Sequence, residues 1–167
     1  MHSFPAVIDA STRIIILGSM PGIASLDARQ YYAHPRNQFW RLMDDIGAAA
    51  SELPYQQRLQ ALLAHGVGLW DVLHSCVRHG SLDAAIERRS AVPNDLLPLL
   101  RTSPVMRLCC NGTSAYAALL RHYGKPLAAE FAYLDIRRLP STSPAYAGLR
   151  YADKLAAWRI ALAPAPR

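Results

Sequence analysis

The chain has 167 residues, of which 51% are hydrophobic, and a formal charge of +6, so we expect a globular protein for which a polyanion is a candidate partner. Its three cysteines include no Cys-x-x-Cys pair and no set of four, which argues against a disulfide framework, an iron–sulfur cluster and a structural zinc. No secretory pattern and no apolar run of membrane-spanning length is present, so we expect a cytoplasmic protein without a membrane partner.

Residues 12–17 predict a central strand, because aliphatic and β-branched residues follow one another there without alternation. The next five residues, Gly18-Ser19-Met20-Pro21-Gly22, form what we call the first turn, whose glycines and proline allow a ligand to approach the backbone. Residues 23–36 are expected to be a loop with about one helical turn. A helix over 37–47 is predicted by apolar residues at helical spacing.

The segment before this helix, YYAHPRNQFW, is dense in polar and stacking side chains, and Asn37 has two interpretations. It can be the N-cap of the helix, a role that suits asparagine, or it can be a functional group of a site.

Residues 53–65 predict an amphipathic helix of the scaffold, and residues 67–73 predict a second buried strand. Asp71 falls near the carboxyl end of that strand, either as a satisfied carboxylate that caps a loop or as a site residue. Residues 74–89, the basic stretch, are interpreted either as a face toward a phosphate backbone or as an ordinary solvated face.

Further along the chain, Asn94 is predicted to cap a helix over 96–101. Two strand regions follow, at residues 105–110 and 133–139, and the helices predicted around them cover 115–123 and 150–162. Asn111 opens the turn after the third strand, where Asn-Gly is also a common turn dipeptide. The hydroxyl-rich segment after the fourth strand, residues 140–146, is the last loop, and residues 163–167 are expected to be a frayed tail.

Strands that alternate with helices predict a single α/β domain, residues 1–167, with a mostly parallel sheet covered by helices on both faces. Ligands bind such open sheets at the carboxyl ends of the strands. The first turn, Asp71, Asn111 and the last loop all fall at those ends, so we expect them to converge. No phosphate-binding loop, dinucleotide fingerprint or nucleophile elbow is present, which disfavours nucleotide hydrolysis and hydride transfer.

The motifs GSMPG, YYAHPRNQFW, VGLWDV, LCCNG and LPSTSPA together resemble the uracil-DNA glycosylase superfamily, in particular its hypoxanthine-DNA glycosylase branch, over nearly the whole chain. The resemblance implies a three-layer α/β/α fold with a central four-stranded parallel sheet. It also implies a DNA repair enzyme of base excision, nucleoid-associated and monomeric, that flips a deaminated base out of double-stranded DNA without a metal or an organic cofactor.

In other branches the first turn carries a water-activating Asp or Asn, where this sequence has Met20. Methionine can neither orient nor deprotonate water. The hypoxanthine branch assigns catalysis to the asparagine that corresponds to Asn37, which would orient water and stabilise an oxocarbenium-like sugar. The resemblance gives the following base-binding set: Gly18, Ser19, Met20, Tyr31, Tyr32, Phe39, Asp71 and Asn111. For Phe39, core packing remains the alternative.

In the last loop, the resemblance implies that Pro140, Ser141, Thr142 and Ser143 contact the DNA backbone, and that Pro144, Ala145 and Tyr146 form a wedge. Other branches have His or Asn where Leu139 stands, so strong uracil activity is not expected. The leading hypothesis is a monofunctional DNA glycosylase that prefers hypoxanthine, with uracil or xanthine also possible as substrates. The alternative is a non-catalytic protein of the same fold that binds damaged or mismatched DNA, suggested by Met20 and Leu139 together.

Overall fold

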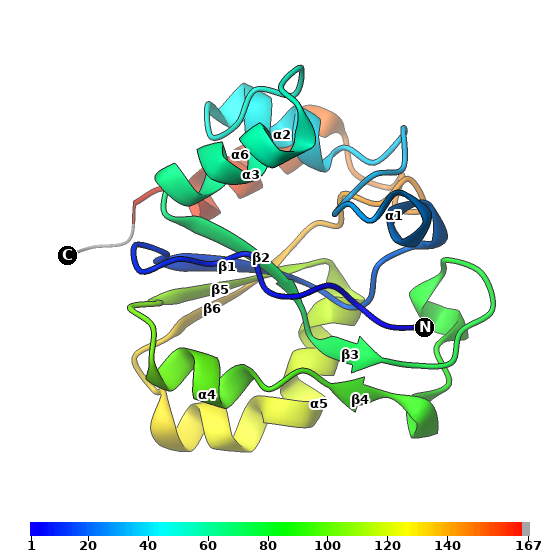
Figure 1. The fold of residues 1–167 in the computed structure, drawn as a ribbon, viewed down its shortest axis with the longest axis vertical. Coiled ribbons are helices and arrows are strands. Elements are labelled where there is room, and N and C mark those ends of the chain that lie inside the picture. Colours follow the sequence, from blue (N-terminus) through cyan, green and yellow to red (C-terminus); the bar gives the residue numbers. More distant parts are fainter. Residues whose placement is uncertain (165–167) are drawn as a thin grey trace.

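A parallel sheet of four strands in the order β2-β1-β5-β6 forms the centre of the computed structural model, which describes residues 1–164 (Figure 1). The strands are β1 (Ile14–Gly18), β2 (Val67–Asp71), β5 (Arg107–Asn111) and β6 (Asp135–Leu139). Residues 165–167, the end of the predicted tail, lie outside the described residues. In register, Gly18 is paired with Asp71 and Asn111 with Leu139, so the carboxyl ends of all the strands meet at one edge.

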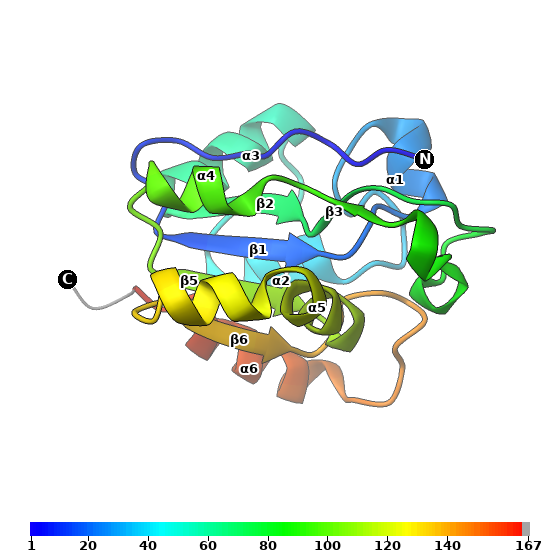
Figure 2. The ribbon, with the colours of Figure 1, turned by 90° about the horizontal axis from the view of Figure 1, so that it is seen from below.

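Helices cover both faces of the sheet, which confirms the predicted three-layer α/β/α fold (Figures 1 and 2). One face is covered by α2 (Phe39–Ile46), α3 (Tyr55–Ala64) and α6 (Tyr151–Ala161), and the other by α4 (Leu96–Arg101) and α5 (Thr113–Glu130). Successive residues of β1 pack alternately into these two cores, Ile14 and Ile16 into one and Ile15 and Leu17 into the other. This two-sided burial explains the unbroken apolar run in the sequence.

The helix α1 (Ile23–Ala28) and the strands β3 (Leu73–Ser75) and β4 (Val92–Pro93) lie beyond the carboxyl edge of the sheet (Figures 1 and 2). The helix α1 corresponds to the helical turn expected within residues 23–36. The strands β3 and β4 form a separate antiparallel pair. The predicted strand over 67–73 is therefore divided, because the chain leaves the parallel sheet after Asp71 and pairs with β4 instead.

Two local predictions are wrong. The predicted helix end at residue 123 is too early, since α5 continues through Pro126 to Glu130 and buries Leu127 in the core. Asn94 does not cap α4, whose N-cap is Asp95. Its side chain is buried and donates from Nδ2 to the main-chain oxygen of Asp71, at 2.8 Å.

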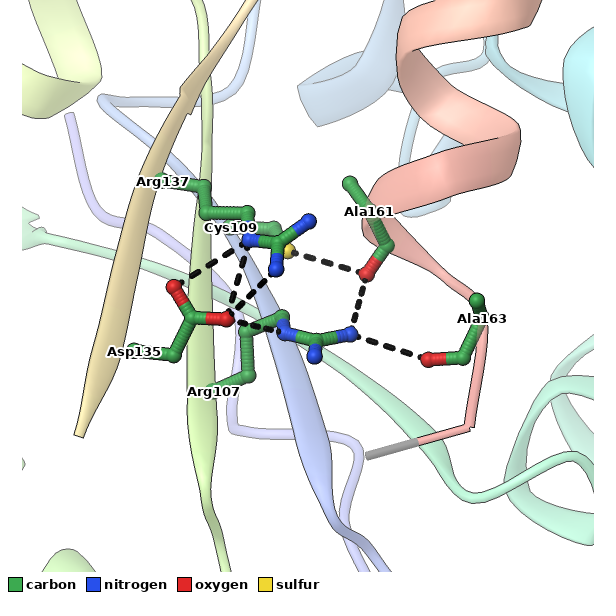
Figure 3. A network of polar contacts seen from close by, with 6 residues as sticks. All are labelled: Arg107, Cys109, Asp135, Arg137, Ala161 and Ala163. Atoms are coloured by element: carbon green, nitrogen blue, oxygen red, sulfur yellow. Dashed lines mark hydrogen bonds and ion pairs between the residues drawn. The ribbon is translucent and has the colours of Figure 1, made fainter. Parts of the chain in front are cut away.

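A polar network at the opposite edge, where β5 and β6 begin, ties α6 to the sheet (Figure 3). Arg107 donates from Nη1 to the main-chain oxygens of Ala161 (2.8 Å) and Ala163 (2.9 Å), and from Nε to Asp135 (2.8 Å). Arg137 also pairs with Asp135, at 2.8 Å. These contacts satisfy carbonyl groups at the end of α6, which no further helical turn can satisfy. Within residues 1–164, no helix combines the length and the apolar character needed to cross a membrane.

Candidate functional site

A pocket at the carboxyl ends of β1, β2 and β5 collects residues from distant parts of the chain. Its lining comprises Gly18, Ser19, Met20, Pro21, Gly22, Ala24, Ser25, Tyr31, Tyr32, His34, Asn37, Asp71, Ser81, Asp83, Asn111, Ser141, Thr142, Ser143 and Pro144. The four junctions that were expected to converge thus meet in one cavity. Phe39, Pro140, Ala145 and Tyr146 are the predicted site residues that do not line it.

The first turn is held from behind by Arg78, whose side chain is completely buried. The guanidinium donates to the main-chain oxygens of Met20 and Pro21 and lies 3.7 Å from a carboxylate oxygen of Asp83. For Arg78, both interpretations of the basic stretch are wrong, because this cation satisfies buried carbonyl groups and faces neither phosphate nor solvent. Met20 itself is 6% exposed and packs into the core below the pocket.

Asp71 places a buried carboxyl group on the pocket wall. The residue is 4% exposed, and its Oδ2 atom has no hydrogen-bond partner within residues 1–164. Burial and, to a lesser extent, the negative charge of Asp83 raise the pKa of Asp71 to about 8, against the opposing effect of Arg78. Its other oxygen packs against Gly18, since a Cβ atom at that glycine would lie only 2.5 Å from Oδ1. Gly18 is thus the residue that leaves room for the carboxyl group.

Tyr32 presents its ring to the same space in a left-handed backbone conformation, φ 57°, which is uncommon for residues other than glycine. The ring stacks on Phe39, with centroids 3.9 Å apart and an interplanar angle of 22°. Phe39 is fully buried behind it, so the structure favours core packing for this residue. Tyr31 is also buried, and its hydroxyl donates to the main-chain oxygen of Pro5 at 3.1 Å. The Tyr32 hydroxyl has no partner within the described residues.

Asn37 lies two residues before α2 and is partly buried in the pocket lining. The N-cap position itself belongs to Gln38. The Asn37 side chain nevertheless accepts a hydrogen bond at Oδ1 from the main-chain N–H of Phe39, at 3.0 Å, so it makes a contact of the capping type. The N-cap interpretation of Asn37 is therefore wrong, although this contact orients the amide. Because the residue lines the pocket, a functional role stays a prediction.

Asn111 and Thr142 fasten the last loop to the end of β5. The Asn111 amide donates from Nδ2 to Thr142 Oγ1 at 2.9 Å, and its Oδ1 accepts the Thr142 N–H at 3.0 Å. The carbonyl oxygen of Thr142 accepts the main-chain N–H of Gln38 at 3.0 Å, which connects the loop to the segment that contains Asn37. Thr142 is fully buried, so it positions the loop in this conformation. A contact of Asn111 with a base stays a prediction.

Beyond Thr142 the last loop becomes exposed. Ser143 donates its N–H to Ser141 Oγ at 3.1 Å, and Ala145 donates to Ser143 Oγ at 3.2 Å, so local turns shape this part of the chain. The Tyr146 side chain is 45% exposed at the tip. At the base of the loop, the main-chain oxygen of Pro140 accepts from Trp158 Nε1 at 2.9 Å.

Sequence reasoning missed two titratable groups of the pocket, His34 and Asp83. Asp83 was overlooked because the basic residues around it dominate the local pattern, although an acid that interrupts a basic stretch is itself a signal. Burial raises its pKa above the usual range, with Arg78 in opposition. No group of three or more His, Cys, Asp or Glu side chains within residues 1–164 is placed to hold a metal ion.

The fold and the pocket define the class of protein. It is an α/β protein with an open parallel sheet, and its site lies at the carboxyl ends of the strands, where the five sequence motifs meet. The chain belongs to the uracil DNA glycosylase superfamily, whose family model matches residues 5–162.

Among known proteins, it is similar to two that are named hypoxanthine DNA glycosylase. One, from Methanosarcina acetivorans, is 39% identical over 86% of this chain and 87% of its own length. The other, from Methanosarcina barkeri, is 43% identical over 60% of this chain and 66% of its own length. A solution NMR structure from M. acetivorans, described as a candidate uracil DNA glycosylase, superposes with a TM-score of 0.76 at 32% identity. That comparison covers 96% of this chain and 95% of the other.

Proposed function

We propose that this DNA glycosylase, acting as a monomer, hydrolyses the N-glycosidic bond of a deaminated base in double-stranded DNA, with hypoxanthine as the preferred base. The observation that carries the proposal is the pocket itself, which combines an amide (Asn37), a buried carboxyl group (Asp71) and an aromatic ring (Tyr32). One oxygen of that carboxyl group, Oδ2, has no hydrogen-bond partner among residues 1–164. A pocket of this kind can act on a base only after the nucleotide has left the stack, so base flipping is part of the proposal.

The base is held between an aromatic face and a polar edge. Tyr32, supported from behind by Phe39, offers a ring on which a base can stack, a contact worth about 1–3 kcal/mol per base in other proteins. Hypoxanthine presents a donor at N1–H and an acceptor at O6. Asp71 lies where it can bind that edge, on the pocket wall next to Gly18.

Asn37 acts on the attacking water. Its amide, held by the Phe39 N–H, orients a water molecule toward C1′ of the flipped nucleotide and stabilises the positive charge that develops on the sugar. The water oxygen forms a bond to C1′, the bond from C1′ to the base breaks with its electron pair on the base, and one water proton is released. Met20 cannot share this task, because a thioether is only a weak acceptor. No lysine is among the residues that line the pocket, which supports a monofunctional enzyme without a Schiff-base step.

The last loop contacts the duplex. Ser141 and Ser143 supply hydroxyl groups for backbone phosphates, and the following Pro144, Ala145 and Tyr146 enter the stack at the vacated position. The exposed Tyr146 side chain and the anchoring of the loop through Thr142 support this role.

A single-turnover assay on duplexes with one deoxyinosine, deoxyuridine or deoxyxanthosine tests the proposal, with alkaline cleavage to reveal abasic sites and a parallel measurement of DNA binding. We expect release from deoxyinosine to be fastest. Release from deoxyuridine alone would refute the base preference while keeping the superfamily activity. Intact binding with no release from any of the three would favour the non-catalytic DNA-binding alternative.

A further inference from the structure

The environment of the Asp71 side chain is unusual for a carboxylate. A buried carboxylate normally accepts two or more hydrogen bonds or pairs with a cation. Asp71 is 4% exposed, yet Oδ2 receives no hydrogen bond within residues 1–164. The nearby cation, Arg78, directs its guanidinium to main-chain oxygens and to Asp83. The pocket therefore provides little of what would stabilise a negative charge at this position.

Five titratable or charged groups of the described residues lie in or beside the pocket that contains Asp71. Tyr31 and Tyr32, from the segment before α2, are close enough to Asp71 for its charge to raise the pKa of each. His34 lines the same pocket. Asp83 and Arg78 act on Asp71 from the chain after β3. Asp83 adds a second acid to the same pocket, and its negative charge disfavours ionisation of Asp71. Burial and the Asp71 carboxyl together raise the pKa of Tyr32, so that phenol stays neutral. Of the groups that act on Asp71 within residues 1–164, only Arg78 favours its ionised form.

We propose that Asp71 reads the flipped base as a neutral carboxylic acid, with its O–H donated to O6 and its carbonyl oxygen accepting N1–H. This inference rests on the proposed function and specifies how the site recognises the lactam edge of a deaminated base. A carboxylic acid presents one donor and one acceptor side by side, which is the complement of an adjacent N–H and C=O. An ionised carboxylate presents two acceptors and would place one of them against O6, with repulsion instead of a hydrogen bond.

The same geometry explains why uracil and xanthine remain possible substrates, since both carry a lactam edge. Adenine presents an N1 acceptor and an N6 donor, which a carboxylic acid can also bind, so the rejection of adenine depends on contacts other than Asp71. The fixed position of the group agrees with a recognition role. Asn94 holds the Asp71 main chain and Gly18 leaves room for the carboxyl group, so the acid is held in place before a base arrives.

The test is the pH dependence of single-turnover release from deoxyinosine between pH 6 and 9.5, for the wild type, Asp71→Asn and Asp83→Asn. The wild-type rate should fall by about 30-fold from pH 7 to pH 9.5, as expected for one group that must stay protonated with a pKa of about 8. Asparagine keeps a donor and an acceptor but cannot ionise, so Asp71→Asn should lack this fall. Any decrease that remains in this variant reports the ionisation of the inosine base. Asp83→Asn should move the fall to lower pH, because it removes a negative charge that opposes ionisation of Asp71.

Three results would overturn the inference. They are a wild-type rate that rises between pH 7 and pH 9, a wild-type profile parallel to that of Asp71→Asn, and complete loss of release in a folded Asp71→Asn protein. No release by the wild type at any pH would overturn the proposed function as well, which separates the two failures. If Asp71→Asn does not fold, the protonation state of Asp71 can be measured in the wild type. The measurement is a pH titration of the carboxyl-carbon NMR resonances of protein labelled at aspartate. One resonance should titrate above pH 7, and titration of all of them below pH 5 would refute the neutral acid.

Discussion

Adding one methyl group to Gly18 tests the arrangement of the pocket wall. In Gly18→Ala the new Cβ atom would lie 2.5 Å from Asp71 Oδ1, whereas real Cβ contacts are essentially never shorter than 3.0 Å and seldom shorter than 3.4 Å. The carboxyl group must therefore retreat by about 0.5–0.9 Å, from a position that is 96% buried. Overpacking of this kind costs about 1–3 kcal/mol. A displacement close to 1 Å at a substrate-positioning group can reduce a rate by about 100-fold.

Thermal unfolding and single-turnover release from deoxyinosine measure the two effects of Gly18→Ala. Each kcal/mol should lower the melting temperature by about 2–4 °C in a chain of this size. Gly22→Ala in the same turn is the matched control for stability, because its Cβ would lie 3.5 Å from the nearest atom, Ser81 Oγ, an ordinary contact. A Gly18→Ala protein with the melting temperature and the release rate of the wild type would refute the reasoning about Asp71.

Three further variants test the supports of the site. Arg78→Ala should cost roughly 3 kcal/mol or more in the free energy of unfolding, because it leaves buried carbonyl groups of the first turn without a donor. Urea denaturation measures this cost, and a value below about 1 kcal/mol would contradict the proposed support of the first turn by Arg78. The raised pKa of Asp71 means that the folded state keeps a proton which the unfolded state has released, so the stability from this group is complete below about pH 4 and declines as the pH rises toward 8. Asp71→Asn should therefore raise the melting temperature relative to wild type at pH 8 and not at pH 4, whereas equal effects at both values would exclude the pKa shift. Asn111→Ala should cost about 1–3 kcal/mol, since it leaves the buried hydroxyl and N–H of Thr142 unpaired. Hydrogen exchange should then become faster in the last loop, and unchanged protection there would argue against the anchoring of this loop by Asn111.

The parallel sheet, and the convergence of the site residues at one edge of it, could be predicted from the sequence. Buried parallel strands are marked by unbroken apolar runs, as at residues 14–17, and polar residues directly after such runs must meet at one edge of the sheet. The position of Asp71 at the end of β2 and of Asn111 at the end of β5 followed from this rule alone.

Side-chain partners were less predictable, because they depend on contacts between segments far apart in the chain. Arg78 resembles a surface cation in its local sequence, yet it is buried against the first turn, 57 and 58 positions earlier. Asn94 precedes a helix, as a cap residue would. Its side-chain amide nevertheless donates to the main-chain oxygen of Asp71, 23 positions earlier in the chain, and does not cap the helix. Gly124 and Pro126 suggest a helix end, and burial of Leu127 in the core outweighs their poor helix propensity.

Catalysis by Asn37 is the central claim. It is tested most directly by single-turnover release from a deoxyinosine duplex with Asn37→Ala, beside Gln57→Ala as a control that removes an exposed amide on α3. We predict that Asn37→Ala abolishes measurable release while DNA binding stays close to wild type. Its melting temperature should fall by only about 2–4 °C, because the lost contact with the Phe39 N–H is worth about 1 kcal/mol. Gln57→Ala should release hypoxanthine at the wild-type rate. Release by Asn37→Ala at the wild-type rate would contradict the account.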